Sequence, residues 1–211
     1  MQLEFINNEP RCACVLVLDT SHSMSGDSIN ELNQALKAFE YDLKSDTLAS
    51  KRVDVAIVTF GPVSLQQDFV NASTFIAPML NTTGDTPMGA ALLHATAVLE
   101  QRKQSYIANG IPFYRPWIIL ITDGAPTDDV TQAAKSIQHL EHRQGVAFFA
   151  LGVKNADMDR LSTIAVRSPL KIKDHHFREF FMWLSASLKS VSQSNPGEQV
   201  KLSSVDGWTL V

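Results

Sequence analysis

The sequence predicts an α/β fold, a doubly wound and mostly parallel sheet of about six strands flanked by helices. Two observations predict it. Short and almost wholly apolar runs alternate along the chain with longer segments whose apolar residues recur every three or four positions. Such runs are typical of strands buried on both faces, and such recurrence is typical of amphipathic helices. Regular alternation of the two favours a parallel sheet covered by helices on both sides.

The first half of the chain contains three predicted strands and one predicted helix. Residues 13–18 form an apolar run that stops at Asp19, a pattern typical of a central parallel strand. Through residues 25–45 the apolar positions follow the helical repeat. A second apolar run covers residues 53–60, and we expect residues 64–70 to form a short strand beside it.

The second half of the chain repeats the alternation after a polar loop at residues 81–86. Three more apolar runs predict strands, the last of them at an edge, at residues 117–122, 146–151 and 170–172. Segments with the helical repeat predict helices at residues 87–105, 127–140, 157–165 and 175–191. Pro87 suits the first position of its helix, where the missing N–H costs nothing.

A change of composition divides the chain into one domain and a tail. The chain has 211 residues, of which 45% are hydrophobic and 19% charged, so one packed α/β domain is expected. Residues 1–191 carry the alternating pattern. From Ser192 onward the composition turns polar, with a break at 195–197, and residues 192–211 are predicted to be a C-terminal polar tail.

Charge and hydropathy exclude several classes of partner. A formal charge of −4 without a basic stripe argues against binding to nucleic acid or to a membrane surface. The N-terminal segment lacks the pattern of a signal peptide, and no apolar stretch approaches the roughly 20 residues that span a bilayer. Cys12 and Cys14 lie two apart on one strand face, where bridging is strained, so we expect reduced core thiols and a cytoplasmic location.

Three polar segments follow strands or begin a helix, and they carry the candidate metal ligands. Because carboxyl ends of parallel strands share one rim, segments distant in sequence are expected to converge there. The converging side chains are two carboxylates and three hydroxyls: Asp19, Ser21, Ser23, Thr86 and Asp123. These hard oxygen donors favour Mg²⁺, with Ca²⁺ or Mn²⁺ as alternatives, over zinc or copper.

The spacing of these residues predicts binding rather than catalysis. Alternate residues leaving a strand point the same way, so Asp19, Ser21 and Ser23 can face one ion. Hydroxyl ligands leave the charge of the ion only partly neutralised, so the ion would attract a carboxylate from a partner. The sequence therefore predicts a non-enzymatic, metal-dependent protein-binding module whose partner offers an Asp or Glu.

The five residues resemble the pattern of a von Willebrand factor type A domain with a metal-ion-dependent adhesion site. That pattern is Asp-x-Ser-x-Ser after the first strand, a Thr before a later helix and an Asp after the fourth main strand. The resemblance covers residues 11–190 and implies a Rossmann-like fold. It also implies direct hydroxyl contacts with the metal, carboxylates that often act through water, and one position open to an acidic group.

A narrower resemblance comes from the C-terminal third. Residues 180–188, 190–192 and 206–208 are similar to the bacterial tellurium-resistance group of these domains, called TerY or YegL-like. This resemblance implies a cytoplasmic protein of a stress-response system, with a kinase-like protein or a protein phosphatase as possible partners. One departure is His22, where the group usually has Gly, so the loop is expected to tolerate positive φ less well.

Two alternatives to the binding module stay open at this stage. A magnesium-dependent phosphatase of the haloacid-dehalogenase kind also has an Asp after its first strand, but it wants a general acid where this chain has Ser21. A scaffold with a degenerate metal site is favoured by His22 alone. Taken singly, Thr86 before Pro87 suits a helix cap and Asp123 an ordinary turn, yet their joint occurrence favours a metal site.

Overall fold

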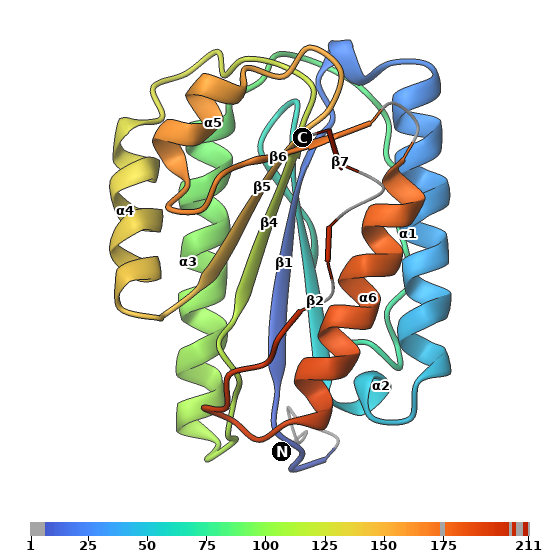
Figure 1. Cartoon of the computed structure of the whole chain (residues 1–211), viewed down its shortest axis with the longest axis vertical. Coiled ribbons are helices and arrows are strands. Elements are labelled where there is room, and N and C mark those ends of the chain that lie inside the picture. The colour runs from blue at the N-terminus through green and yellow to red at the C-terminus, as the bar shows by residue number, and fades with distance from the viewer. Residues whose placement is uncertain (1–6, 174–175, 203, 206–208, 211) are drawn as a thin grey trace.

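The first apolar run forms β1 (Cys12–Asp19), a strand whose eight residues are all buried. The computed structural model describes residues 7–173, 176–202, 204–205 and 209–210. In this part of the chain β1 lies inside a seven-stranded sheet of order β3-β2-β1-β4-β5-β6-β7 (Figure 1). The other strands are β2 (Val53–Phe60), β3 (Ser64–Asn71), β4 (Trp117–Thr122), β5 (Ala147–Gly152), β6 (Leu170–Ile172) and β7 (Thr209–Leu210).

Most neighbouring strands are parallel, as the alternating pattern predicts. Strand β1 pairs in parallel with β2 and β4, and β4, β5 and β6 continue the parallel order. The two outermost pairs, β2 with β3 and β6 with β7, are antiparallel. The predicted α/β class is confirmed, and all six predicted strands are present.

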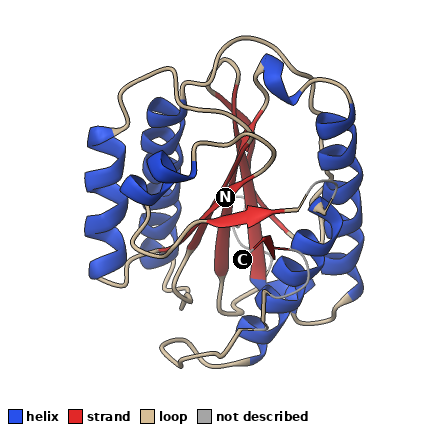
Figure 2. Cartoon of the chain, turned by 45° about the horizontal axis from the view of Figure 1, so that its top comes forward, coloured by secondary structure: helices blue, strands red, loops and turns tan. Residues whose placement is uncertain are grey.

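Helices cover both faces of the sheet (Figure 2). Described helices are α1 (Asp27–Ser45), α2 (Ala49–Arg52), α3 (Met88–Ala108), α4 (Thr131–His142), α5 (Met158–Ile164) and α6 (Phe177–Gln193), with the one-turn helix η1 (His22–Met24) after β1. Helices α1 and α6 lie on one face, whereas α3 and α4 lie on the other. None of the helices in the described ranges is both long enough and apolar enough to cross a membrane.

The side chains of β1 alternate between two hydrophobic cores. Cys14, Leu16 and Leu18 belong to the core shared with α1 and α6, and Val15 and Val17 to the core shared with α3 and α4. Each of these side chains is fully buried. Burial of a Val or Leu side chain contributes roughly 1.5–3 kcal/mol to the stability of the fold. A central strand with two apolar faces is thereby fixed in place, and with it the position of Asp19.

The structure differs from the sequence prediction at three helices. Helix α3 begins at Met88, one residue after Pro87, and α4 begins at Thr131 instead of residue 127. The short helix α2 was not predicted, because its four residues are too few to show a repeat. The segment before α4 remains a loop because Asp128 and Asp129 use their carboxylates to bind backbone N–H groups at two different helix starts.

Part of the segment predicted to be a polar tail belongs to the folded structure. Strand β7 adds to the sheet beside β6, and it was not predicted from the sequence. Val200, Leu202 and Val205 pack against the hydrophobic core on the α1 and α6 face. Residues 206–208, which contribute to the tellurium-resistance resemblance, lie outside the described residues, as do residues 174–175 at the predicted start of the last helix.

Candidate metal centre

The candidate site lies where the strand order of the sheet reverses. From β1 the sheet extends to β2 on one side and to β4 on the other, so loops leaving β1 and β4 diverge and open a crevice between them. Asp19 is the last residue of β1, and Asp123 directly follows β4. Because Leu18 pairs with Ile121, the two carboxylates leave neighbouring strands within one residue of the same height.

Hydrogen bonds connect four of the five predicted residues. The Ser21 backbone N–H donates to Asp19 Oδ1 at 2.9 Å. The Ser21 and Ser23 hydroxyl oxygens lie 2.9 Å apart, and the Ser23 hydroxyl donates to Asp123 Oδ1 at 2.5 Å. Ser23 and Asp123 are 100 positions apart in the chain, so this bond shows that the predicted convergence of the β1 and β4 loops occurs.

Thr86, the fifth predicted residue, lies beside the same cluster. A β-carbon at Gly124 would lie 3.7 Å from Ser23 Oγ and 3.7 Å from Thr86 Oγ1, so both hydroxyls border this glycine. The Thr86 backbone is fixed by the loop after Asp123, since its N–H donates to Thr127 Oγ1 at 3.2 Å and its carbonyl accepts from Thr127 N at 2.9 Å. The three predicted segments therefore meet at one rim.

The loop after β1 is held against two neighbouring segments. The Thr20 N–H donates to the Phe60 carbonyl at 2.9 Å, and the Thr20 carbonyl accepts from Thr83 N at 2.7 Å. Gly61 allows this approach, because a β-carbon there would clash with the Thr83 carbonyl oxygen. The positions of Ser21 and Ser23 are thus set by backbone contacts as well as by their own hydroxyls.

His22 fits the loop without backbone strain, although the resembling group of domains usually has Gly at this position. It begins η1, and the non-glycine residues with positive φ in the described ranges are Gln144 and Lys154. The His22 N–H donates to the Gly84 carbonyl at 3.2 Å, and its side chain is exposed. The loop does not require positive φ at His22, so the lower tolerance of positive φ expected there causes no backbone strain.

The two carboxylates occupy an environment in which a cation would be stabilised. Burial raises the pKa of Asp19, hydrogen bonds from Ser21 and Thr122 lower it, and the nearby charge of Asp123 raises it again. Asp19 is fully buried and Asp123 is 5% exposed. A divalent cation held by these residues would offset both the lost hydration and the repulsion between the two carboxylates.

Thr122 is a member of this cluster whose role was not predicted. Its hydroxyl donates to Asp19 Oδ2 at 2.5 Å, on the opposite side of the carboxylate from Ser21. The sequence places a Thr at the end of an otherwise apolar strand, and that polar residue is the one signal that could have identified it. Thr122 thus orients Asp19 and stabilises its charged form.

The acidic pair at residues 128–129 predicts a helix N-cap, and this prediction is confirmed. Asp128 caps a helix other than the one that follows it. Its two carboxylate oxygens accept from the N–H groups of Gly89 at 2.9 Å and Ala90 at 2.8 Å, so it caps α3 from across the rim. The structural interpretation of Thr86 as the helix cap is therefore wrong: α3 has Pro87 at its N-cap position and no bond from the Thr86 hydroxyl.

The donor set suits a hard divalent cation. No group of three or more His, Cys, Asp and Glu side chains is placed to hold a metal anywhere in the described ranges. A cation at this rim would thus need the hydroxyls of Ser21, Ser23 and Thr86 in addition to the two carboxylates. Oxygen donors without sulfur or imidazole fit Mg²⁺, Ca²⁺ or Mn²⁺.

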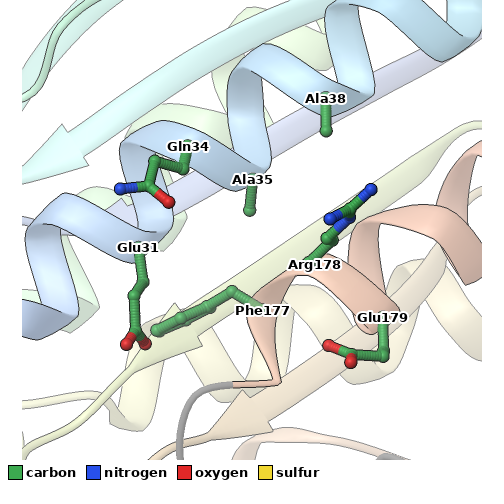
Figure 3. A pocket seen from close by; sticks show the side chains of 7 residues that line it. All are labelled: Glu31, Gln34, Ala35, Ala38, Phe177, Arg178 and Glu179. Carbon is green, nitrogen blue, oxygen red and sulfur yellow. The ribbon is translucent and has the colours of Figure 1, made fainter.

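A hollow of about 390 Å³ lies between α1 and the start of α6 (Figure 3). Its charged side chains have both signs, since Glu31 and Glu179 line it together with Arg178. Phe177 forms its apolar wall, and none of the five candidate metal ligands lines it. The hollow is therefore separate from the candidate metal centre.

The fold and the candidate site define a class of protein, an α/β domain with polar side chains gathered at the switch point of its sheet. Residues 14–182 match the von Willebrand factor type A domain, and the chain belongs to this family. Mouse collagen alpha-4(VI) chain is 25% identical over 184 residues, which cover 84% of this chain and 7% of the collagen chain. Human collagen alpha-1(XX) chain is 41% identical over 98 residues, 46% of this chain. The chain spans about 7% of the length of these curated relatives.

Solved structures agree on the fold. The domain of the type V pili tip protein Mfa5 from Porphyromonas gingivalis has a TM-score of 0.66 and 11% identity, over 90% of this chain and 99% of that one. The pilus adhesin SpaC from Lactobacillus rhamnosus GG, in its open conformation, has a TM-score of 0.67 and 14% identity, over 87% of this chain and 30% of that one. At these identities the likeness concerns the fold.

Proposed function

We propose that this chain is a non-enzymatic protein-binding module whose binding depends on a divalent metal, Mg²⁺ or alternatively Ca²⁺ or Mn²⁺. The observation that carries the proposal is the 2.5 Å hydrogen bond between the Ser23 hydroxyl and Asp123 Oδ1, which joins the β1 loop to the β4 loop at the rim. Membership of the von Willebrand factor type A family supports it, since relatives of this chain include collagens and a pilus adhesin.

The side chains divide the work of holding the metal. Asp19 and Asp123 would supply negative charge, and the hydroxyls of Ser21, Ser23 and Thr86 would supply neutral oxygens. When bound, the ion supplies positive charge that attracts an acidic oxygen. The five candidate ligands include only two carboxylates. Part of the positive charge of the ion would therefore remain available to an Asp or Glu of a partner. Ser23 is exposed, so the hydroxyl end of the cluster faces the side from which a partner can approach.

Titration calorimetry with a matched pair of serine variants tests the metal site. Ser23→Ala removes one proposed ligand, whereas Ser25→Ala removes an exposed hydroxyl of the same loop that bonds to Thr82 instead. We expect Mg²⁺, Ca²⁺ or Mn²⁺ to bind the wild type and Ser25→Ala equally, and Ser23→Ala at least about tenfold more weakly. Equal binding by all three proteins, or no binding by any, contradicts the metal site.

The partner is tested by capture experiments on the same variants. Wild type and Ser25→Ala are expected to retain a protein partner in Mg²⁺ and to lose it in chelator, and Ser23→Ala to lose it in both. Retention in chelator contradicts metal dependence. Turnover of an aryl phosphate, or an aspartyl-phosphate at Asp19, would contradict the non-enzymatic proposal and favour a phosphatase.

We further propose a cytoplasmic role in a bacterial tellurite or stress response, with a kinase-like protein or a protein phosphatase as the partner. This proposal depends on the resemblance in residues 180–188 and 190–192, which lie in α6, and in residues 206–208. Mass spectrometry of the captured proteins is expected to identify one of these two partners. Chelator-sensitive capture of an unrelated protein alone would contradict this assignment while leaving the metal site standing.

A further inference from the structure

A groove of about 620 Å³ lies at the end of the sheet opposite the candidate metal centre. It borders Trp117 at the start of β4 and Ala147 at the start of β5, so it lies at the opposite end of these strands from Asp123. This volume falls within the range of roughly 300–1,000 Å³ that small-molecule sites occupy. The inference that follows is independent of the candidate metal centre.

The walls of the groove combine aromatic and aliphatic surfaces. Trp117 and Phe149 lie on one side with their ring centroids 5.1 Å apart, and both line the groove. Val200 and Leu202 from the C-terminal segment line it as well. That segment returns along the sheet from the lower end of α6 toward β7 (Figure 1). A flat apolar body would therefore contact protein on more than one side.

Three cationic side chains from three different segments line the same groove. They are Lys103 of α3, Arg115 just before β4, and Arg167 after α5. Lys103 is paired with Glu100 at 2.7 Å, and Arg167 Nη1 with Glu141 Oε1 at 2.6 Å.

The Glu141 carboxylate is already satisfied, since it also accepts from Phe148 N at 3.1 Å and Val166 N at 3.2 Å. The carboxylate of Glu198, which also lines the groove, accepts from the backbone and side chain of Asn195. Arg167 lies against the aromatic wall, with its guanidinium carbon 5.1 Å from the centroid of the Phe149 ring, and Glu141 is its acidic partner.

Arg115, the third cation, is held by backbone carbonyls instead of by an acid. Its Nε donates to the Val146 carbonyl at 2.8 Å, and its Nη2 to the Glu141 carbonyl at 3.2 Å. Within the described part of the chain it forms no salt bridge. Burial and the nearby charge of Arg167 lower the pKa of Arg115, and the charge of Glu141 raises it. The guanidinium is thus fixed in orientation, and the Glu141 carboxylate acts on its charge without forming an ion pair with it.

We propose that this groove binds a small organic anion, with its carboxylate or phosphate at Arg115 and a flat apolar body against the part-exposed side chains of Phe149, Val200 and Leu202. A guanidinium has five N–H donors in a rigid fork that suits either anion. The two bonds to carbonyls use Nε and Nη2, and they leave the Nη1 donors for the ligand. Lys103 and Arg167 add positive charge around the same anion.

Three probes of one shape test the proposal: benzoate, phenyl phosphate and the neutral amide benzamide. In NMR titrations with chelator present, at least one anion is expected to shift the amides of Gly145 and Ala147, and benzamide to bind at least about tenfold more weakly. Whichever anion binds more tightly identifies the preferred head group. Failure of both anions at millimolar concentration, or equal binding of benzamide, overturns the proposal.

Substitutions locate the anion within the groove. Arg115→Gln is expected to weaken binding of the preferred anion at least about tenfold, and Lys103→Gln by a smaller factor. Arg160→Gln removes an exposed arginine of α5 outside the groove and should bind as the wild type does. If Arg115→Gln fails to fold, Lys103→Gln decides alone. Unchanged affinity in the folded variants of Arg115 and Lys103 overturns the assignment.

Discussion

Thr122 stabilises the charged form of Asp19 at the end of β1. The Thr122 hydroxyl donates to Asp19 Oδ2 at 2.5 Å in a buried environment, where burial alone raises the pKa of that carboxyl. Hydrogen bonds to buried charged groups contribute about 1.5–3 kcal/mol, so the loss of this donor should be measurable. The shape of the site would be unchanged, because valine has the shape of threonine.

Thr122→Val is therefore expected to weaken metal binding about tenfold and to raise the pKa of Asp19. The metal needs the carboxylate form, so binding of the variant should be lost at a higher pH than binding of the wild type as the pH falls. Calorimetric titrations with Mg²⁺ over a range of acid to neutral pH measure both effects. Thr96→Val, on α3 and bonded to the Leu92 carbonyl, is the control; equal behaviour of the two variants would contradict a role for Thr122.

The thiols of β1 carry a second pH dependence. Burial raises the pKa of Cys12 from 9.0 to about 12, with a smaller effect of Asp54, and the pKa of Cys14 is raised as well. An acid whose pKa is higher in the folded state stays protonated there while the unfolded chain ionises. The free energy of unfolding should consequently fall as the pH rises above about 9.

Chemical denaturation between pH 8 and 10 measures this fall. Each buried thiol contributes up to about 1.4 kcal/mol per pH unit above the unfolded pKa, so a Cys12→Ala, Cys14→Ala double variant should show a flatter profile. The native thiols should also react slowly with alkylating reagents until denaturant is added. A wild type and a double variant with parallel profiles would contradict the assignment of this pH dependence to β1.

At the scale of elements, Asp128 connects the loop after β4 to the start of α3. Its carboxylate accepts from Gly89 N and Ala90 N, and it is the negative charge placed at the positive end of that helix. The close approach depends on Gly89, because a β-carbon there would lie 2.5 Å from the Asp129 carbonyl oxygen. This contact also sets the distance between the two loops that carry Thr86 and Asp123.

Asp128→Ala is expected to lower the free energy of unfolding by about 1 kcal/mol, the usual cost of removing a helix cap. Urea denaturation of the metal-free protein measures it, with Asp85→Ala, an exposed acid of the neighbouring loop, as the matched control. The same variant should bind metal more weakly, because Thr86 loses a fixed neighbour. An effect no larger than that of Asp85→Ala would contradict the cap.

The elements that the sequence predicts best are those whose signal lies within their own residues. Strand β1 and strand β4 are continuous apolar runs, so their ends and the residues that follow them, Asp19 and Asp123, could be located from the sequence. The start of α4 could not be located in this way, because the Asp128 carboxylate accepts a hydrogen bond from Ala90 N of α3, 38 positions away in the chain. Contacts of that kind have no local pattern.

The same distinction explains the candidate site. Ser21 and Ser23 follow Asp19 at alternate positions, and this spacing is visible in the sequence. The role of Thr122 depends on the pairing of β1 with β4, which brings its hydroxyl to Asp19 from 103 positions away. Whether His22 strains the loop depended on the η1 geometry, which only the structure shows.

At the scale of the whole molecule, the C-terminal segment covers apolar surface that the helices leave open. Val200, Leu202 and Val205 are spaced along the segment and pack against the core that contains Trp117 and Trp183. Farther along the segment, β7 continues the sheet beyond β6. The segment begins at α6, where the Tyr114 hydroxyl donates to the Ser194 carbonyl at 2.8 Å. A polar composition thus conceals a few apolar residues that hold the segment in place.

Deletion of residues 195–211 is accordingly expected to lower the free energy of unfolding by roughly 3 kcal/mol, about 1 kcal/mol for each of the three half-buried apolar side chains. The full-length variant Val200→Ala, Leu202→Ala should lose about two thirds of that amount, which separates packing from chain length, and Gln199→Ala is the exposed control. Thermal or urea unfolding measures all three. A deletion without effect would mean that the segment only rests on the sheet. A deletion that costs stability while the double variant does not would assign the stabilisation to β7 and its pairing with β6.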